Sequence, residues 1–271
     1  MRTISAGDVE LSTLTLGRPS ETATVFLHGL VAGNMATWYS TVALPLSASR
    51  QVILYDLRGH GSSSMPTQGF DLESHVDDLC SVLGELLPED AKVDLVGHSL
   101  GALIALQFAL RHPQRVHSLV LVDAPMPANH WVGPSLLAAN SRDGVAAWID
   151  EQPHLATGVT GRRRERLRQR IETLVFDTSL VADVLSMGRT PVTALAALNV
   201  PTLLIYGRLS PCLVAGDELL QALPNAQLVL LDAGHDVPIE APSALLQAIQ
   251  TFYAAQHTAS LAQSGALSSW T

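Results

Sequence analysis

The sequence predicts an α/β protein in which helices cover both faces of a mostly parallel β-sheet. Its 271 residues are 47% hydrophobic, enough to build the core of one α/β domain with an insertion. Short β-like runs alternate with helical stretches along most of the chain, which is the pattern of parallel strands joined by helices. Residues 124–201 separate two of these strands and are too many for a single crossover, so an inserted helical cap is expected.

The first predicted element is an antiparallel hairpin at the edge of the sheet. Its second strand is the alternating run at 9–16, which follows the turn signal Gly7-Asp8. Further strands are expected at 24–27, 52–55, 93–96, 118–122, 202–206 and 227–231. With the hairpin, these runs predict an eight-stranded sheet.

Helical patterns separate the strands. Asp71 is the expected N-cap of the first helix, because its side chain can accept a hydrogen bond from the first helical turn. Helices are predicted at about 71–87, 100–112, 213–222 and 241–254.

The chain is expected to form a core with one insertion. The core comprises residues 1–124 and 190–256, and the cap comprises residues 125–189, with helical composition near 134–149 and 162–187. Residues 257–271 are rich in Ser, Ala and Gly, and we expect them to form a tail or a docked terminal helix.

Charge and composition exclude several classes of function. The net charge of −9 repels phosphates, so no nucleic-acid partner is expected. The apolar runs are too short to span a membrane, and residues 1–8 lack a signal-peptide core, so a cytoplasmic protein is expected. The histidines lack metal-ligand spacings and the two cysteines, Cys80 and Cys212, form no CxxC pair, so neither a metal nor a cofactor is expected.

The basic run at 162–170 stands out against this acidic background. It fits the solvated face of a helix, and it also fits a surface that binds an anionic carrier or a phosphate-bearing substrate.

The strongest functional signal is the pentapeptide Gly-His-Ser-Leu-Gly at 97–101. An apolar strand precedes it and a helical run follows, which is the context of a nucleophilic serine on a sharp strand-to-helix turn. Gly97 and Gly101 have a steric reason to be glycine, because they let the strand and the helix approach closely. Ser99 is therefore the candidate nucleophile.

A serine hydroxyl needs a base to take its proton and a third group to orient that base. His235 follows the last predicted strand and precedes the final helix, which places it at the carboxyl edge of the sheet beside Ser99. We interpret His235 as the general base. His98 is expected to support the serine turn, and Asp232, Asp236 and Glu240 to support the His235 loop.

Over residues 20–255 the chain resembles the α/β-hydrolase superfamily, especially its capped, cofactor-free esterases, C–C-bond hydrolases and perhydrolases. The resemblance rests on His28-Gly29 followed by Trp38, on the segment 56–63, on the serine turn, and on Gly-His with the later Glu-x-Pro around His235. It implies the α/β-hydrolase fold with its cap. It also implies an oxyanion hole formed by the backbone N–H groups of Leu30 and Leu100.

The chain departs from the family at the acid. Most members have Gly-x-x-Asp after the penultimate strand, whereas this chain ends the same pattern in Ser210. Some relatives, including certain haloalkane dehalogenases, carry the acid after the next strand beyond the nucleophile, where this chain has Asp123. Asp123 is the predicted acid. Asp217, a Ser–His dyad and an impaired site remain as alternatives.

The predicted reaction is hydrolysis of a carboxylic ester or thioester through an acyl-enzyme. A serine nucleophile disfavours dehalogenase and epoxide hydrolase chemistry, which would leave a stable ether on the enzyme. The alternatives are cleavage of a C–C bond, acyl transfer or cyclisation, and a non-hydrolytic ligand-binding homologue.

The expected partner is a small acyl substrate, either free or linked to a carrier or to CoA. Apolar cap residues are candidates to line its pocket, although core packing explains each of them equally well. Trp131, Leu136 and Trp148 are the predicted substrate-binding residues, with Leu137 and Leu155 as further candidates.

Overall fold

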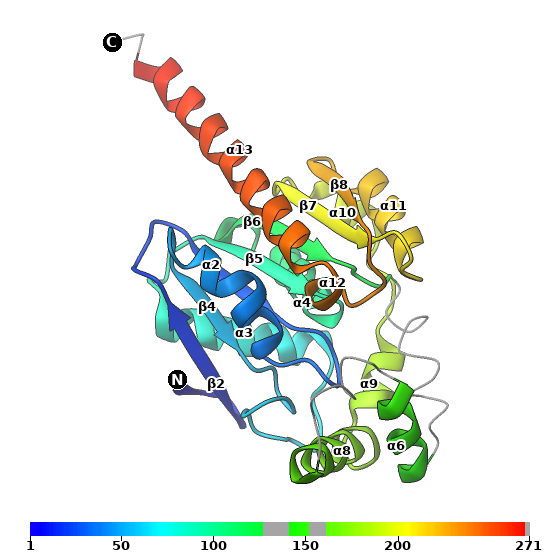
Figure 1. The fold of residues 1–271 in the computed structure, drawn as a ribbon. Helices are drawn as coiled ribbons and strands as arrows, with labels where there is room; N and C mark the ends of the chain where they lie inside the picture. The colour runs from blue at the N-terminus through cyan, green and yellow to red at the C-terminus, as the bar shows by residue number, and fades with distance from the viewer. Residues whose placement is uncertain (127–140, 152–160, 269–271) are drawn as a thin grey trace.

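The computed structural model describes residues 1–126, 141–151 and 161–268. They form an eight-stranded sheet in the order β1-β2-β4-β3-β5-β6-β7-β8 (Figure 1). From β4 to β8 all neighbouring strands are parallel, and β2 pairs antiparallel with β1 and β4. The strands are Arg2–Ala6, Val9–Leu16, Ala23–Leu27, Val52–Tyr55, Val93–His98, Val116–Val122, Thr202–Gly207 and Ala226–Leu231. The predicted strand set and fold class are therefore confirmed.

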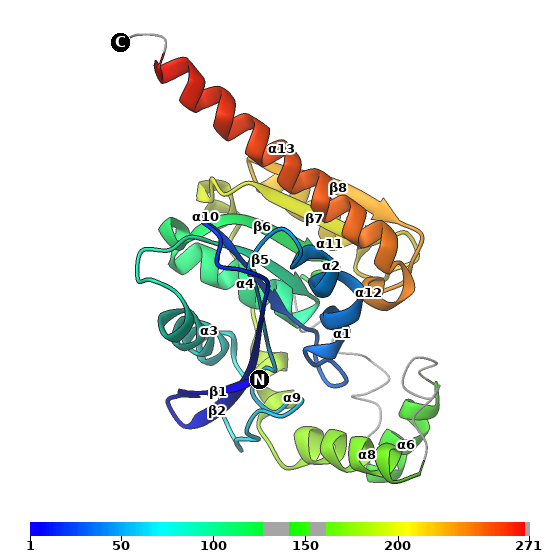
Figure 2. The same cartoon turned by 60° about the vertical axis from the view of Figure 1, so that its left-hand side comes forward.

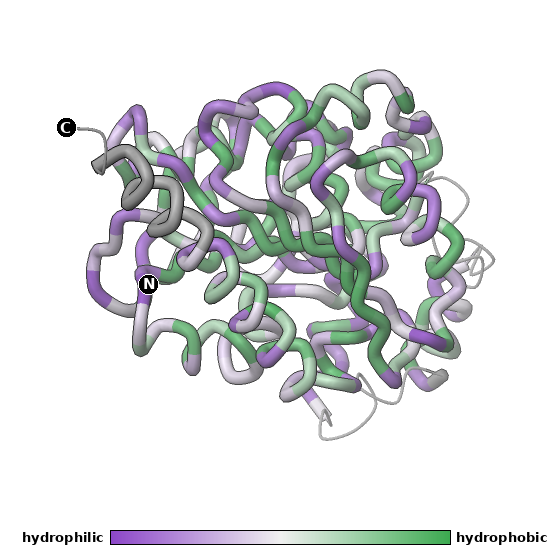
Figure 3. Tube along the Cα trace, turned by 90° about the horizontal axis from the view of Figure 1, so that it is seen from above, coloured by the Kyte–Doolittle hydropathy of each residue, from purple (hydrophilic) through white to green (hydrophobic). Residues whose placement is uncertain are grey.

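The central strands are apolar because both of their faces are covered. Every residue of β3, β4 and β5 is buried, as expected for parallel strands between two helical layers. β1 instead alternates exposed and buried positions, as an edge strand with one solvated face does. Figure 3 shows hydrophobic residues gathered along the strands through the middle of the molecule.

Two groups of helices cover the sheet, one on each face (Figure 2). On one face α3, α4, α10 and α11 bury side chains against the sheet in one large cluster. On the other, the short helices α1 and α2, α12 and α13 pack in a second cluster around Trp38. The first group spans Leu72–Leu86, Leu100–Arg111, Val192–Ala197 and Leu213–Ala222; the second spans Ala36–Trp38, Leu44–Leu46, Val237–Glu240 and Pro242–Ser268.

The helices agree with the predicted ones at some ends and differ at others. α3 begins after Asp71, whose carboxylate accepts a hydrogen bond from the Ser74 N–H, so the predicted N-cap is confirmed. The helical segment at 36–46, which includes a π-helix at Tyr39–Ala43, was not predicted. The final helix begins at Pro242 as expected but continues to Ser268, so the prediction of an end at 254 was wrong. Its far half extends away from the sheet (Figure 1).

In the described part of the chain after β6 lie three more helices: α6 at Arg142–Glu151, α8 at Gly161–Phe176 and α9 at Leu180–Ser186. α6 and α8 bury Val145, Ile149 and Ile171 in a third cluster, against which Val31 of the loop after β3 also packs. The Arg170 guanidinium of α8 donates hydrogen bonds to backbone carbonyls of the loop after β4. These contacts place α6 and α8 against the carboxyl edge of the sheet, although the assignment of 125–189 as a cap domain stays a prediction.

Candidate active site

Ser99 lies on the turn between β5 and α4 and has a strained backbone. Its φ is 53° and its ψ is −119°, in a region that side-chain-bearing residues rarely adopt. A Cβ at Gly97 would overlap the backbone of Gly101, and a Cβ at Gly101 would lie 2.7 Å from the carbonyl oxygen of His28. Both glycines thus have a steric reason: at Gly97 the strand β5 meets the helix α4, and at Gly101 the helix meets the end of β3, without room for a side chain.

His235 lies in the loop between β8 and α12 with one ring nitrogen facing Ser99. The distance between His235 Nε2 and Ser99 Oγ is 3.1 Å. His98, buried beside the serine, donates a hydrogen bond of 2.9 Å from Nε2 to the His235 carbonyl oxygen. Burial and the neighbouring His235 lower the pKa of His98 to about 4, which keeps its ring neutral at pH 7. His98 therefore fixes the position of the His235 backbone, a contact that the sequence did not predict, since His98 was expected to support the serine turn.

The His235 loop is held by a second anchor on its other side. The Glu240 carboxylate of α12 accepts hydrogen bonds from the N–H groups of Gly234, at 2.7 Å, and Asp236, at 3.2 Å. Glu240 thus fixes the two residues that flank His235, and its predicted supporting position is confirmed. Asp232 instead pairs with Arg208 at the surface, where its side chain is 94% exposed.

Asp123 follows β6 and is completely buried. Its Oδ2 lies 2.6 Å from His235 Nδ1, and its Oδ1 accepts a hydrogen bond of 2.9 Å from the Gly207 N–H. Its own N–H donates to the Ile205 carbonyl oxygen, which holds Asp123 at a positive φ of 49°. Asp217, the other acid considered, is exposed on α11. The structure therefore brings Ser99, His235 and Asp123 together, with the Asp123 carboxylate in contact with the His235 ring.

Ser210 and Cys212 complete the surroundings of Asp123. The Ser210 hydroxyl donates to Asp123 Oδ2 and accepts a hydrogen bond of 3.0 Å from the Cys212 N–H. The Cys212 Sγ lies 3.8 Å from His235 Nδ1. Burial, with the charge of Asp123, raises the pKa of the Cys212 thiol, so this side chain is a neutral thiol and a poor nucleophile.

Sequence reasoning treated Ser210 as the residue that stands where an acid is missing and did not predict its contact with Asp123. This contact follows from the order of the strands in the sheet, which the sequence does not state. Ser210 follows β7 and Asp123 follows β6, and these two strands are neighbours in the sheet, so the loops after them meet at one edge.

The loop after β3 lies directly against the serine turn. A Cβ at Gly29 would lie 3.3 Å from the Ser99 Cβ, which shows how closely the residue before Leu30 approaches the nucleophile candidate. Leu100 opens α4, and the first N–H groups of a helix have no acceptor within it. The assignment of the Leu30 and Leu100 N–H groups as oxyanion donors stays a prediction.

Two buried histidines hold this loop. His28 Nδ1 contacts the Gly29 carbonyl oxygen at 2.8 Å, and its Nε2 accepts a hydrogen bond of 3.0 Å from the Leu57 N–H. His60 Nε2 accepts a hydrogen bond of 2.9 Å from the Val31 N–H. Burial lowers the pKa of His28 to about 4 and that of His60 to about 3, so both rings are neutral and can accept at Nε2.

The predicted substrate-binding residues are only partly described. Trp131 and Leu136 lie outside the described residues, as do Leu137 and Leu155. Trp148 lies on α6 and packs, partly buried, against the third hydrophobic cluster. Its role in binding a substrate stays a prediction.

The basic run at 162–170 lies on α8, whose first ten residues are all exposed or half-buried. Two of its arginines form ion pairs within the chain: Arg164 with Asp150, and Arg168 with Glu165 and Glu172. These pairs fit the interpretation of the run as a solvated helix face.

A serine, a buried aspartate and a histidine that follow one another in this order along the chain and are joined by hydrogen bonds, with the serine on a strained strand-to-helix turn, are typical of the class of α/β hydrolases. A family model described as alpha/beta hydrolase fold matches residues 23–140. The chain is 31% identical over 252 residues to a pimeloyl-[acyl-carrier protein] methyl ester esterase of Aeromonas hydrophila, a match that covers 84% of this chain and 94% of that protein. It therefore belongs to the alpha/beta hydrolase family.

Two further proteins show how varied the similar enzymes are. The chain is 31% identical over 188 residues to a 2-hydroxy-6-oxo-2,4-heptadienoate hydrolase of Pseudomonas putida. This match covers 68% of this chain and 59% of that hydrolase. A solved structure of Est816, described as an N-acyl homoserine lactone degrading enzyme, matches with a TM-score of 0.73 and 26% sequence identity. The match covers 93% of this chain and 100% of the Est816 chain. Among the described residues, no helix is long and apolar enough to cross a membrane.

Proposed function

We propose that the protein is a serine hydrolase that cleaves a carboxylic ester or thioester through an acyl-enzyme. The observation that carries this proposal is the continuous chain from Ser99 Oγ to His235 Nε2, at 3.1 Å, and from His235 Nδ1 to Asp123 Oδ2, at 2.6 Å. Both distances fall within hydrogen-bond range, so the serine proton can pass to His235 without a large movement while Asp123 holds the ring in place.

In the first half of the proposed reaction, Ser99 Oγ attacks the carbonyl carbon and His235 Nε2 takes the serine proton. Asp123 holds the ring with Nε2 toward the serine and stabilises the imidazolium that forms. The Leu30 and Leu100 N–H groups donate to the oxygen that becomes negatively charged. His235 then gives its proton to the leaving alcohol or thiol, which departs from the acyl-enzyme.

In the second half, His235 removes a proton from a water molecule that attacks the acyl carbonyl. The carboxylic acid leaves and Ser99 recovers its proton from His235, which restores the free enzyme. The similarity to the Aeromonas esterase supports an ester as the substrate. The similarity to the Pseudomonas heptadienoate hydrolase supports C–C bond cleavage as a second candidate.

The proposal is tested with p-nitrophenyl esters of increasing acyl length and with a fluorophosphonate that labels activated serines. Ser99→Ala should lose both turnover and labelling, whereas Ser49→Ala, which changes an exposed serine, should keep both. Turnover by Ser99→Ala would overturn the nucleophile assignment. Labelling of Ser99 without ester turnover would favour the C–C substrate, to be checked with a vinylogous 1,5-diketone.

A further inference from the structure

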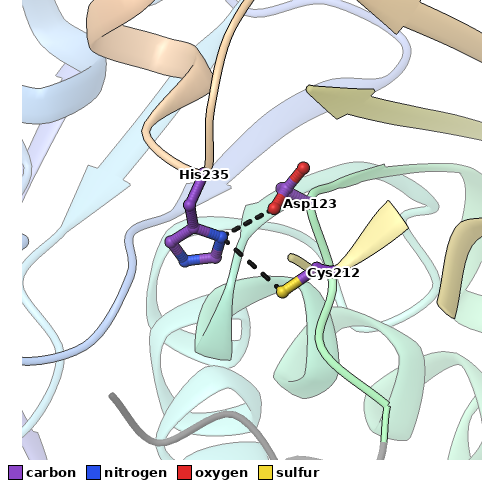
Figure 4. A group of neighbouring side chains, drawn as sticks. All are labelled: Asp123, Cys212 and His235. Carbon is purple, nitrogen blue, oxygen red and sulfur yellow. Dashed lines mark hydrogen bonds and ion pairs between the residues drawn. The ribbon is translucent and has the colours of Figure 1, made fainter. Parts of the chain in front are cut away.

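Three potential metal ligands meet beside the serine, although they are far apart in the sequence. Asp123 comes from the end of β6, Cys212 from the residue before α11, and His235 from the loop after β8 (Figure 4). One ligand atom of each, a carboxylate oxygen, Sγ and a ring nitrogen, lies within 4.8 Å of the other two.

We propose that Asp123, Cys212 and His235 form a reversible binding site for a thiophilic divalent cation, Zn²⁺ or Cd²⁺, and that the bound ion inhibits the enzyme. The inhibition rests on the proposed function, whereas the binding does not.

The ligand types fit such an ion. Thiolate, imidazole and carboxylate are the ligands that zinc takes in proteins, while Mg²⁺ and Ca²⁺ prefer oxygen ligands alone. The two acidic ligands, Asp123 and the Cys212 thiolate, together balance the charge of a divalent ion. This matters because an uncompensated charge is costly in a buried site, and Asp123 and Cys212 are both buried.

The distances require only a small adjustment. Zinc–ligand bonds of about 2.0–2.3 Å in a tetrahedral site place sulfur and nitrogen roughly 3.6 Å apart, and nitrogen and oxygen roughly 3.4 Å apart. The distance between Cys212 Sγ and His235 Nδ1 is already 3.8 Å. The distance between His235 Nδ1 and Asp123 Oδ2 is 2.6 Å, so the ring and the carboxylate must separate by about 0.8 Å to admit the ion.

The bound ion would inhibit the enzyme because it changes where the protons of His235 and Cys212 lie. In the free protein His235 Nδ1 faces the Asp123 carboxylate, which can only accept, so Nδ1 carries the ring hydrogen, and Cys212 carries a thiol. When the ion binds, Nδ1 becomes a ligand, the ring hydrogen moves to Nε2, and the thiol proton is released to solvent. The balance is one proton released for each ion bound. His235 then presents N–H rather than a lone pair to Ser99 and cannot take the serine proton.

The binding is tested by titrating the protein with Cd²⁺ and following the ultraviolet charge-transfer band of a cadmium–thiolate bond. We expect one equivalent to bind to the wild type and to Ser99→Ala, since Ser99 is not a ligand. The band should disappear in Cys212→Ser and persist in Cys80→Ala. Cys80 is a demanding control because its Sγ also lies near a histidine nitrogen, at 3.7 Å from His112.

The inhibition is tested in the same titration with a p-nitrophenyl ester. The Cd²⁺ concentration for half-inhibition should rise at least tenfold in Cys212→Ser, EDTA should restore activity, and Mg²⁺ should have no effect. A band that survives Cys212→Ser overturns the site. If the wild type shows the cadmium–thiolate band but does not turn over the ester, the metal site stands and the proposed ester hydrolysis is overturned. If the wild type turns over the ester but shows no band, only the metal site is overturned.

Discussion

Ser210 donates its hydroxyl hydrogen to the same Asp123 oxygen, Oδ2, that faces His235 Nδ1. In turn, the Ser210 oxygen accepts a hydrogen bond from the Cys212 N–H. The side chain at the position where the family resemblance predicts an acid thus holds the carboxylate that we propose as its replacement. Ser210 is a positioning residue in the proposed mechanism, since it acts through Asp123.

Removing this hydroxyl should slow turnover without weakening substrate binding. A hydrogen bond to a charged group contributes about 1.5–3 kcal/mol, and part of this should be lost from the transition state, so Ser210→Ala should lower kcat roughly 3–30-fold. KM should stay within about twofold of the wild type. Steady-state kinetics across pH check this. Wild-type kcat and an unchanged pH profile in Ser210→Ala would assign the hydroxyl a purely structural role.

The carboxylate that pairs with His235 should be transferable from position 123, after β6, to position 210, after β7. Asp123→Asn should lower kcat on the order of 10³–10⁴-fold, because an amide neither stabilises the imidazolium nor selects its tautomer. Adding Ser210→Asp should recover at least tenfold of this loss, since Ser210 Oγ already reaches Asp123 Oδ2.

The control for the transfer is Asp232→Asn, which changes an exposed carboxylate in the same loop as His235 and should leave kcat unchanged. Full activity of Asp123→Asn would show that Asp123 is not the acid. No recovery in a folded double variant would show that the two positions are not equivalent.

The glycines of the serine turn should tolerate no side chain. Gly97→Ala places a methyl group against the backbone of Gly101, and neither β5 nor α4 can move without disturbing the buried sheet. We expect the free energy of unfolding to fall by about 2–4 kcal/mol in urea titrations. Gly84→Ala is the matched control, because Gly84 is exposed on α3 with no heavy atom within 4 Å of its added Cβ. It should stabilise the protein by about 0.5–1 kcal/mol. Equal effects at both positions would contradict the packing argument.

Acid should weaken the fold through the buried neutral histidines. His28 has a folded pKa of about 4 and His60 of about 3, both below the value of 6.5 in the unfolded chain. At pH values between the folded and the unfolded pKa, each histidine is protonated in the unfolded chain but not in the folded one. The free energy of unfolding therefore falls as the pH drops below about 6.5. At pH 5.5 the loss is about 1 kcal/mol for each histidine.

Urea titrations at several pH values between 7.5 and 5 check this expectation. His60→Gln removes one of these groups, so its free energy of unfolding should depend less steeply on pH than that of the wild type. His257→Gln changes an exposed histidine on α13 and should keep the wild-type slope. Identical slopes in all three proteins would contradict the proposed contribution of His60.

The sequence by itself determined the features that depend on short stretches of chain. Six apolar runs and the alternating pattern of the first hairpin predicted all eight strands, and the glycines around Ser99 predicted the strained turn, because these signals arise from neighbouring residues. Asp71 was predictable as an N-cap for the same reason: its partner Ser74 lies one turn away. The length of α13 was missed because the Ser- and Gly-containing sequence after 254 lowers helix propensity without preventing a helix.

Only the tertiary structure decided what surrounds Asp123. The sequence predicted Asp123 and left Asp217, a Ser–His dyad and an impaired site open, because the order of residues along the chain does not state which loops meet. The pairing of β6 with β7 and of β7 with β8 brings three loop ends to one edge of the sheet. There His235, Ser210 and Cys212 gather around one buried carboxylate. Such contacts depend on the relative positions of strands distant in sequence, and no local pattern encodes them.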